Sequence, residues 1–89
     1  MNAPLIKREG YFSQTMIDGE VVLLNLDDGA FFSLTGTAAE TWALIDGSRD
    51  REAIVAELAS RHHADPATVA ADLGAFLGEL QARGFIAGG

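Results

Sequence analysis

Two turn signals constrain the fold of this chain more than any other feature of its 89 residues. The dipeptide Asp18-Gly19 and the run Asp27-Asp28-Gly29 bracket the apolar stretch EVVLLNL. Asp-Gly pairs suit the positive φ angles of tight hairpin turns. The segments on the outer sides of the turns, residues 11–17 and 30–34, are rich in aromatic or β-branched side chains. We therefore predict strands at 11–17, 20–26 and 30–34, joined as an antiparallel meander.

Helical signals follow the third predicted strand. Thr35 or Thr37 can cap a first helix, and Thr37 with Glu40 has the spacing of a capping box. Ser48 or Asp50 can cap a second helix. These positions predict two short helices between residues 35 and 63.

The third helix has the sharpest start, because Asp65 is a good N-cap and Pro66 suits the first helical position. Gly84 is expected to end this helix, and residues 85–86 are expected to pack back onto the core. The apolar residues between these ends recur at helical spacing: Val69, Leu73, Phe76, Leu77 and Leu80. Three strands followed by three helices give an α+β fold, with the helices against one face of the sheet.

Length and composition predict one domain at residues 11–87, preceded by a flexible N-terminal arm at residues 1–10. The chain has no cysteine, which excludes disulfides and thiolate sites and favours a cytoplasmic location. Its net charge of −7 opposes binding to nucleic acid or to anionic membranes. No apolar run approaches the roughly 18 residues that a membrane span needs.

The sequence predicts no catalytic residue, no cofactor and no metal site. It contains none of the common phosphate-binding, dinucleotide-binding or metalloprotease motifs. His62 and His63 are adjacent, so on a helix their side chains diverge by about 100° and cannot readily share one ion. We interpret them as surface residues at a helix end, and Trp42, on the apolar arc of the first helix, as a core residue.

The third predicted strand carries the main functional signal. It is apolar, contains neither Lys nor Pro, and comes last in the meander, which places it at an edge of the sheet. An unguarded edge strand offers unpaired main-chain donors and acceptors to an extended peptide. Phe31 and Phe32 point to opposite faces of this strand, and the sequence leaves open which of them faces a groove.

Taken together, these features resemble the PqqD-like family, the recognition elements that act in the biosynthesis of ribosomally synthesised and post-translationally modified peptides (RiPPs). The resemblance spans roughly residues 11–87 and rests on the DDG-x-FF-x-L-x-GT join, Trp42, the Asp46-Gly47 helix stop and the closing ELQARGFI. It implies a winged-helix-like fold and a non-catalytic adaptor function. The adaptor would bind the leader segment of a precursor peptide by β-strand addition and present it to a maturation enzyme. That enzyme would be a leader protease and cyclase or a radical SAM enzyme, and lasso-peptide pathways are favoured over pyrroloquinoline quinone synthesis.

The resemblance also implies a binding site between the third strand and the third helix. Asp72, together with Glu79 and Arg83 on the same side of the third helix, is placed to read charges on a bound peptide. The residues carried over from the family are Ala30, Phe31, Phe32, Ser33 and Leu34 on the strand, and Val69, Asp72, Leu73 and Phe76 on the helix.

Two other functional classes are compatible with parts of the sequence. The acidic charge, the length and Ser48 are typical of a small acyl carrier, and the terminal Gly88-Gly89 is typical of a sulfur carrier. Three consecutive strands do not fit an all-helical acyl carrier, and a β-grasp carrier needs a helix between two hairpins. A DNA-binding function also fits poorly, because the helical arginines are interspersed with at least as many acidic residues.

Overall fold

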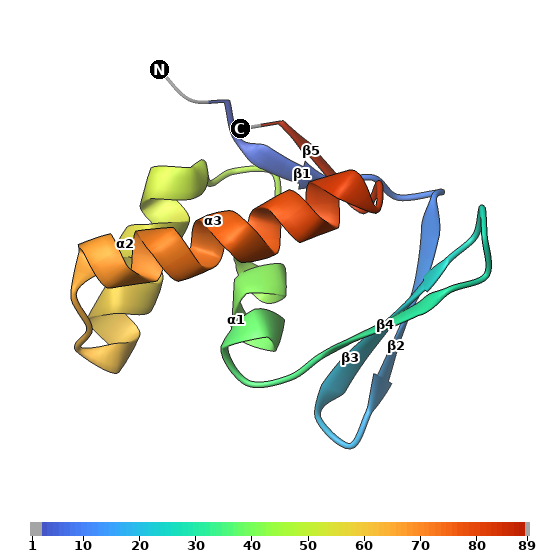
Figure 1. The fold of residues 1–89 in the computed structure, drawn as a ribbon, viewed down its shortest axis with the longest axis horizontal. Helices are drawn as coiled ribbons and strands as arrows, with labels where there is room; N and C mark the ends of the chain where they lie inside the picture. The colour runs from blue at the N-terminus through green and yellow to red at the C-terminus, as the bar shows by residue number, and fades with distance from the viewer. Residues whose placement is uncertain (1–2, 89) are drawn as a thin grey trace.

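The computed structural model describes residues 3–88, which form two small sheets and three helices (Figure 1). This arrangement confirms the predicted α+β class, with a three-stranded antiparallel meander followed by three helices. In chain order the elements are β1 (Leu5–Lys7), β2 (Phe12–Ile17), β3 (Glu20–Asn25), β4 (Phe31–Leu34), α1 (Thr37–Leu44), α2 (Arg51–His62), α3 (Pro66–Ala82) and β5 (Ile86–Gly88).

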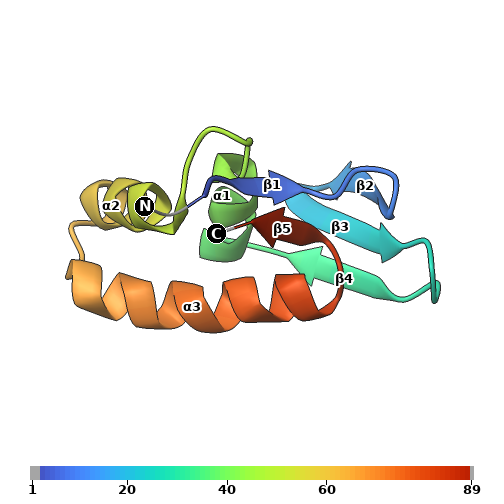
Figure 2. The same cartoon turned by 90° about the horizontal axis from the view of Figure 1, so that it is seen from above.

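The larger sheet has the strand order β2-β3-β4, so β4 lies at one edge. Both pairings are antiparallel, with Leu23 opposite Gln14 on one side and Phe32 on the other. Figure 2 shows the three strands side by side, and in this view β4 is the strand nearest to the C-terminal end of α3.

The core lies between one face of this sheet and the helices. Val21 and Leu23 on β3 and Leu34 on β4 are almost fully buried, together with Trp42 on α1. Trp42 is 1% exposed, which confirms its predicted place in the core. Within residues 3–88, no helix is both long enough and apolar enough to cross a membrane.

Part of the expected N-terminal arm is ordered. Leu5 is fully buried, and its strand β1 pairs with β5 near the other end of the chain. The main chain of Leu5 also bonds to the loop before α2, because its N–H donates to Arg49 C=O (2.9 Å) and its C=O accepts from Gly47 N–H (3.2 Å). These contacts hold residues 5–7 against the domain, contrary to the expectation of a loose arm; residues 1–2 lie outside the described part of the chain.

The helix starts were predicted with mixed success. Asp50 and Asp65 each accept a hydrogen bond from the first turn of their helices, and Pro66 begins α3 as predicted. The predicted capping box at Thr37 is wrong, because the N-cap of α1 is Gly36 and no side chain caps this helix. Glu40, the other member of that box, contacts α2 instead.

Gly36 forms the join between β4 and α1 in a backbone conformation (φ 55°, ψ −128°) that strongly favours glycine. A Cβ atom at this position would meet nothing within 4 Å, so the cost of Gly36→Ala comes from backbone strain alone. We expect this substitution to lower the free energy of unfolding by about 1–3 kcal/mol. Chemical denaturation would measure the change.

Gly78→Ala is the matched control for this prediction. Gly78 lies within α3, and a Cβ there would also meet nothing within 4 Å. Because alanine is the better helix former, we expect this substitution to raise the free energy of unfolding by about 0.5–1 kcal/mol. Equal effects of the two substitutions would contradict the strained conformation assigned to Gly36.

Candidate functional site

One edge of β4 is open. Before this strand, Asn25 N–H donates to Ala30 C=O (2.8 Å), which makes these two residues a hydrogen-bonded pair of the β3–β4 ladder. Hydrogen-bonded and non-hydrogen-bonded pairs alternate along an antiparallel ladder. The N–H and C=O groups of Phe31 and Ser33 therefore point away from β3. Within residues 3–88, no strand pairs with that edge.

Ala30 differs from the other predicted strand residues. It precedes β4, and its N–H donates to the Asp28 carboxylate (2.9 Å) while its C=O accepts from Asn25. Both of its main-chain groups are thus engaged within the turn. Ala30 marks the end of the open edge rather than a part of it.

Side chains alternate across β4. Phe31 is 70% exposed and lies with Ser33 on the face of the sheet that the helices leave uncovered. Phe32 and Leu34 lie on the helix-covered face, where the Phe32 ring stacks on Phe85 with a centroid separation of 6.0 Å. The site residues on β4 therefore divide into two that present main chain to the edge and two that anchor the strand to the core.

A cavity of about 470 Å³ lies between the helices. The four α3 residues that the sequence assigns to the site all line it, and Leu73 among them is 96% buried. Most of the lining is apolar or small. The complete lining is Thr37, Ala38, Thr41, Leu58, His62, Ala64, Thr68, Val69, Asp72, Leu73 and Phe76.

In the chain, the first residues that line the cavity come soon after the end of β4. β4 ends at Leu34, and Thr37 and Ala38, which line the cavity, begin α1 only three residues later. None of the five strand residues assigned to the site, residues 30–34, lines the cavity, so the open edge and the cavity are connected through the start of α1. β2, at the opposite edge of the sheet, contributes no residue to the lining either.

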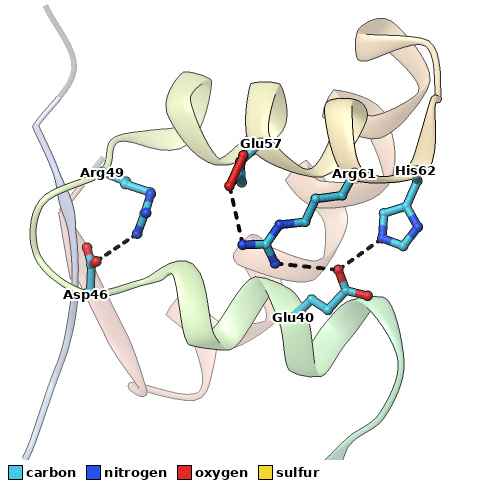
Figure 3. A network of polar contacts seen from close by, with 6 residues as sticks. All are labelled: Glu40, Asp46, Arg49, Glu57, Arg61 and His62. Carbon is cyan, nitrogen blue, oxygen red and sulfur yellow. Dashed lines mark hydrogen bonds and ion pairs between the residues drawn. The ribbon is translucent and has the colours of Figure 1, made fainter.

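Polar contacts join α1 to α2 beside the cavity (Figure 3). The Glu40 carboxylate contacts His62 Nε2 at 3.0 Å and the Arg61 guanidinium at 3.9 Å. Arg61 also contacts Glu57 at 3.3 Å. His62 is exposed at the end of α2, as interpreted from the sequence, and it also lines the cavity.

Only one of the three charged residues that the sequence assigns to the third helix lines the cavity, and one of them, Arg83, is the C-cap of α3. Asp72 lines the cavity, whereas Glu79 and Arg83 pair with each other at 2.9 Å. The Arg83 guanidinium also lies 4.5 Å from the centroid of the Phe32 ring. Glu79 and Arg83 thus satisfy each other at the end of α3 near the sheet.

The half of the cavity that comes from α1 and α2 was not predicted from the sequence. Thr37, Ala38 and Thr41 are small residues on one side of α1, and Thr41 Oγ1 donates to Thr37 C=O (2.8 Å), which satisfies its hydroxyl within the helix. Small side chains in place of large apolar ones leave space beside a helix. That pattern was the one available signal for a cavity at this position.

The structure gives no support to a carrier function at Ser48. The Ser48 hydroxyl donates to Asp46 Oδ1 (2.6 Å), and the Ser48 N–H donates to the same oxygen. These two hydrogen bonds, helped by the charge of Arg49, lower the pKa of Asp46. Ser48 therefore stabilises the loop between α1 and α2, in a fold whose sheet an acyl carrier lacks.

The helical arginines form no basic surface for nucleic acid, because most of them are paired with acids. Arg49 contacts Asp46 at 2.7 Å, and the pairs of Arg61 and Arg83 are described above. Across residues 3–88, no group of three or more His, Asp or Glu side chains converges on a possible metal position.

Comparisons with known proteins point to one family. The sequence profile of the family described as coenzyme PQQ synthesis protein D (PqqD) matches residues 20–86. A solved structure described as TbiB1 in complex with the TbiA(beta) leader peptide is 31% identical in sequence, with a TM-score of 0.81. The match covers 91% of this chain and 94% of that chain. A search of curated proteins finds no significant match.

Proposed function

Because this chain belongs to the PqqD family, we propose that it is a RiPP recognition element that binds a leader peptide. The leader segment of a ribosomally made precursor peptide would add as a strand to β4. The bound precursor would then be presented to a separate maturation enzyme. The chain itself would act as an adaptor and would carry out no chemistry on the peptide.

The main support for this proposal is the open edge of β4, which ends three residues before α1 and the first residues of the cavity lining. Main-chain hydrogen bonds to an exposed edge give affinity that depends little on sequence, and neighbouring pockets supply selectivity. The edge offers the N–H and C=O groups of Phe31 and Ser33. The cavity begins within three residues of the end of this strand.

The expected binding free energies indicate that the edge and the cavity must act together. The four main-chain groups of the edge would contribute about 2–6 kcal/mol, at about 0.5–1.5 kcal/mol for each hydrogen bond. Micromolar binding requires about 8 kcal/mol, after the cost of ordering the peptide has been met. The remainder would come from apolar leader side chains that enter the cavity against Val69, Leu73 and Phe76.

The nine site residues take different roles in this proposal. Phe31 and Ser33 would pair with the leader through their main chains, while Phe32 and Leu34 hold the strand in place from the core side. Ala30 would limit the pairing at the turn. The α3 residues Val69, Asp72, Leu73 and Phe76 would contact leader side chains that point toward the helices.

The partner enzyme is proposed from the family alone. A leader protease and cyclase, or a radical SAM enzyme, would act on the precursor while the leader stays bound. We favour a lasso-peptide pathway because the segment from Gly19 to Trp42 resembles stand-alone lasso recognition proteins. Identification of the genes beside this one would test the pathway independently of peptide binding.

Titration of the isotope-labelled protein with the leader of the precursor encoded beside it tests the proposed function. We expect binding at micromolar affinity or tighter. Amide chemical-shift changes should concentrate in residues 30–34 and 69–76, because these segments would contact the peptide. A scrambled leader of the same composition is the control. Saturating leader that leaves both segments unshifted would overturn the proposal.

A further inference from the structure

The cavity contains one carboxylate that has no partner within residues 3–88. Asp72 lines the cavity from α3, and its side chain makes no ion pair and no hydrogen bond with the described residues. Three other acids on or beside the helices are engaged: Glu79 pairs with Arg83, Glu57 with Arg61, and Asp65 caps α3. Glu52 on α2 also has no partner within residues 3–88, but it does not line the cavity. Asp72 is exposed, and within residues 3–88 no side chain pairs with its charge.

No neighbouring group neutralises this charge. The charged or titratable residues near the cavity on the other helices are Glu40 on α1 and Arg61 and His62 on α2. The Arg51 guanidinium of α2 also lies against α3, beside Gly74, but residues two apart on a helix face different sides, so it is not placed to pair with Asp72. Arg61 is held between Glu57 and Glu40, and His62 contacts Glu40 (Figure 3). The positive end of the α1 dipole also lies at the cavity, but Glu40 occupies the first turn of that helix and offsets it.

The walls around Asp72 suit the shape of a long basic side chain. Val69, Leu73 and Phe76 are apolar and lie within one turn of Asp72 on the same helix. Lysine and arginine bury an aliphatic stem along apolar surface while their charged end stays near water or a counter-ion.

We propose that Asp72 selects a lysine or arginine of the bound leader peptide. The stem of that residue would enter the apolar cavity, and its charged end would pair with the Asp72 carboxylate. This inference rests on the proposed function and specifies one position of the peptide. It assigns to Asp72 a role in choosing among leaders, while the edge of β4 binds any extended segment.

A double-mutant cycle tests this selection. Binding of the leader of the neighbouring precursor would be measured by calorimetry for the wild-type protein and for Asp72→Asn. The same would be done with leader variants in which each Lys or Arg is changed in turn to Gln. We expect Asp72→Asn to weaken binding of the wild-type leader about fivefold to tenfold, equivalent to about 1–1.4 kcal/mol. One leader variant should bind the wild-type protein more weakly than the wild-type leader does, by the same factor. Against Asp72→Asn, that variant and the wild-type leader should bind with equal affinity.

Glu52→Gln is the matched control, because it removes an unpaired carboxylate on α2 that does not line the cavity. We expect it to change leader affinity less than twofold. Unchanged affinity for Asp72→Asn, or no leader position coupled to Asp72, would overturn the selection while leaving leader binding intact. Absence of binding to the wild-type protein would instead overturn the proposed function.

Discussion

Replacement of Ser33 by proline is expected to abolish leader binding while leaving the domain folded. The Ser33 N–H points to the open edge of β4, so proline removes no hydrogen bond to β3. It deletes one of the donors offered to the guest strand and places ring atoms where that strand must approach. We expect affinity to fall by at least about 50-fold, or about 2.3 kcal/mol, in a calorimetric titration.

Two controls separate this effect from damage to the fold. Ser33→Ala keeps the main-chain donor and should bind within about twofold of wild type, because the Ser33 side chain is exposed on the outer face of the sheet. Thermal unfolding should show that Ser33→Pro stays folded at the titration temperature. Leader binding by a folded Ser33→Pro within threefold of wild type would contradict addition of the peptide to this edge.

Trp42→Ala is expected to produce the largest loss of stability. Trp42 is 1% exposed, packs edge-to-face against Phe12 at 5.3 Å and donates its Nε1–H to Gln14 Oε1 (2.9 Å). Lys7 covers the ring at 4.6 Å, and burial in this position lowers the pKa of Lys7. Removal of a buried aromatic ring costs about 3–5 kcal/mol. In a domain of this size, that loss should lower Tm by about 15 °C or more.

The matched variant is Trp42→Phe, which keeps a ring in the core but loses the hydrogen bond to Gln14. Because Gln14 is exposed and can bond to water instead, we expect this change to cost about 1–2 kcal/mol. Both Tm values can be measured by differential scanning calorimetry. A Trp42→Ala domain with a Tm within 5 °C of wild type would contradict the central place of Trp42 in the core.

The parts of this fold that depend on neighbouring residues could be predicted from the sequence. The Asp18-Gly19 and Asp27-Asp28-Gly29 turns set the meander, and the Asp65-Pro66 start of α3 followed from local capping chemistry. The α1 start was misassigned between adjacent candidates. Thr37 is a residue type that commonly caps helices, but the join between β4 and α1 requires a positive φ angle, which Gly36 adopts.

Pairings between distant residues could not be predicted. β1 and β5 are each three residues long and lie about eighty positions apart, so neither shows a strand pattern of its own. The same limit applied to the cavity, whose lining joins α1, α2 and α3. The α3 half was implied by family resemblance, whereas Thr41 and His62 gained their positions only from the packing of three helices.

The sequence also did not show which side chains of β4 face the helices and which face away from them. Alternation showed that Phe31 and Phe32 face opposite sides, but the sequence did not choose between them. The register of β3 against β4 makes the choice: the Phe32 side chain faces the helices, and Phe31 exposes its side chain and directs its main chain to the edge. A slip of one residue would reverse both assignments.

Amide hydrogen exchange of β4, with and without the leader of the neighbouring precursor, tests strand addition most directly. If the leader adds to the edge of β4, Phe31 and Ser33 will exchange fast in the free protein and will be strongly protected in the complex. Phe32 and Leu34, which bond to β3, should be protected in either state. Saturated complex in which Phe31 and Ser33 still exchange as fast as in the free protein would contradict strand addition.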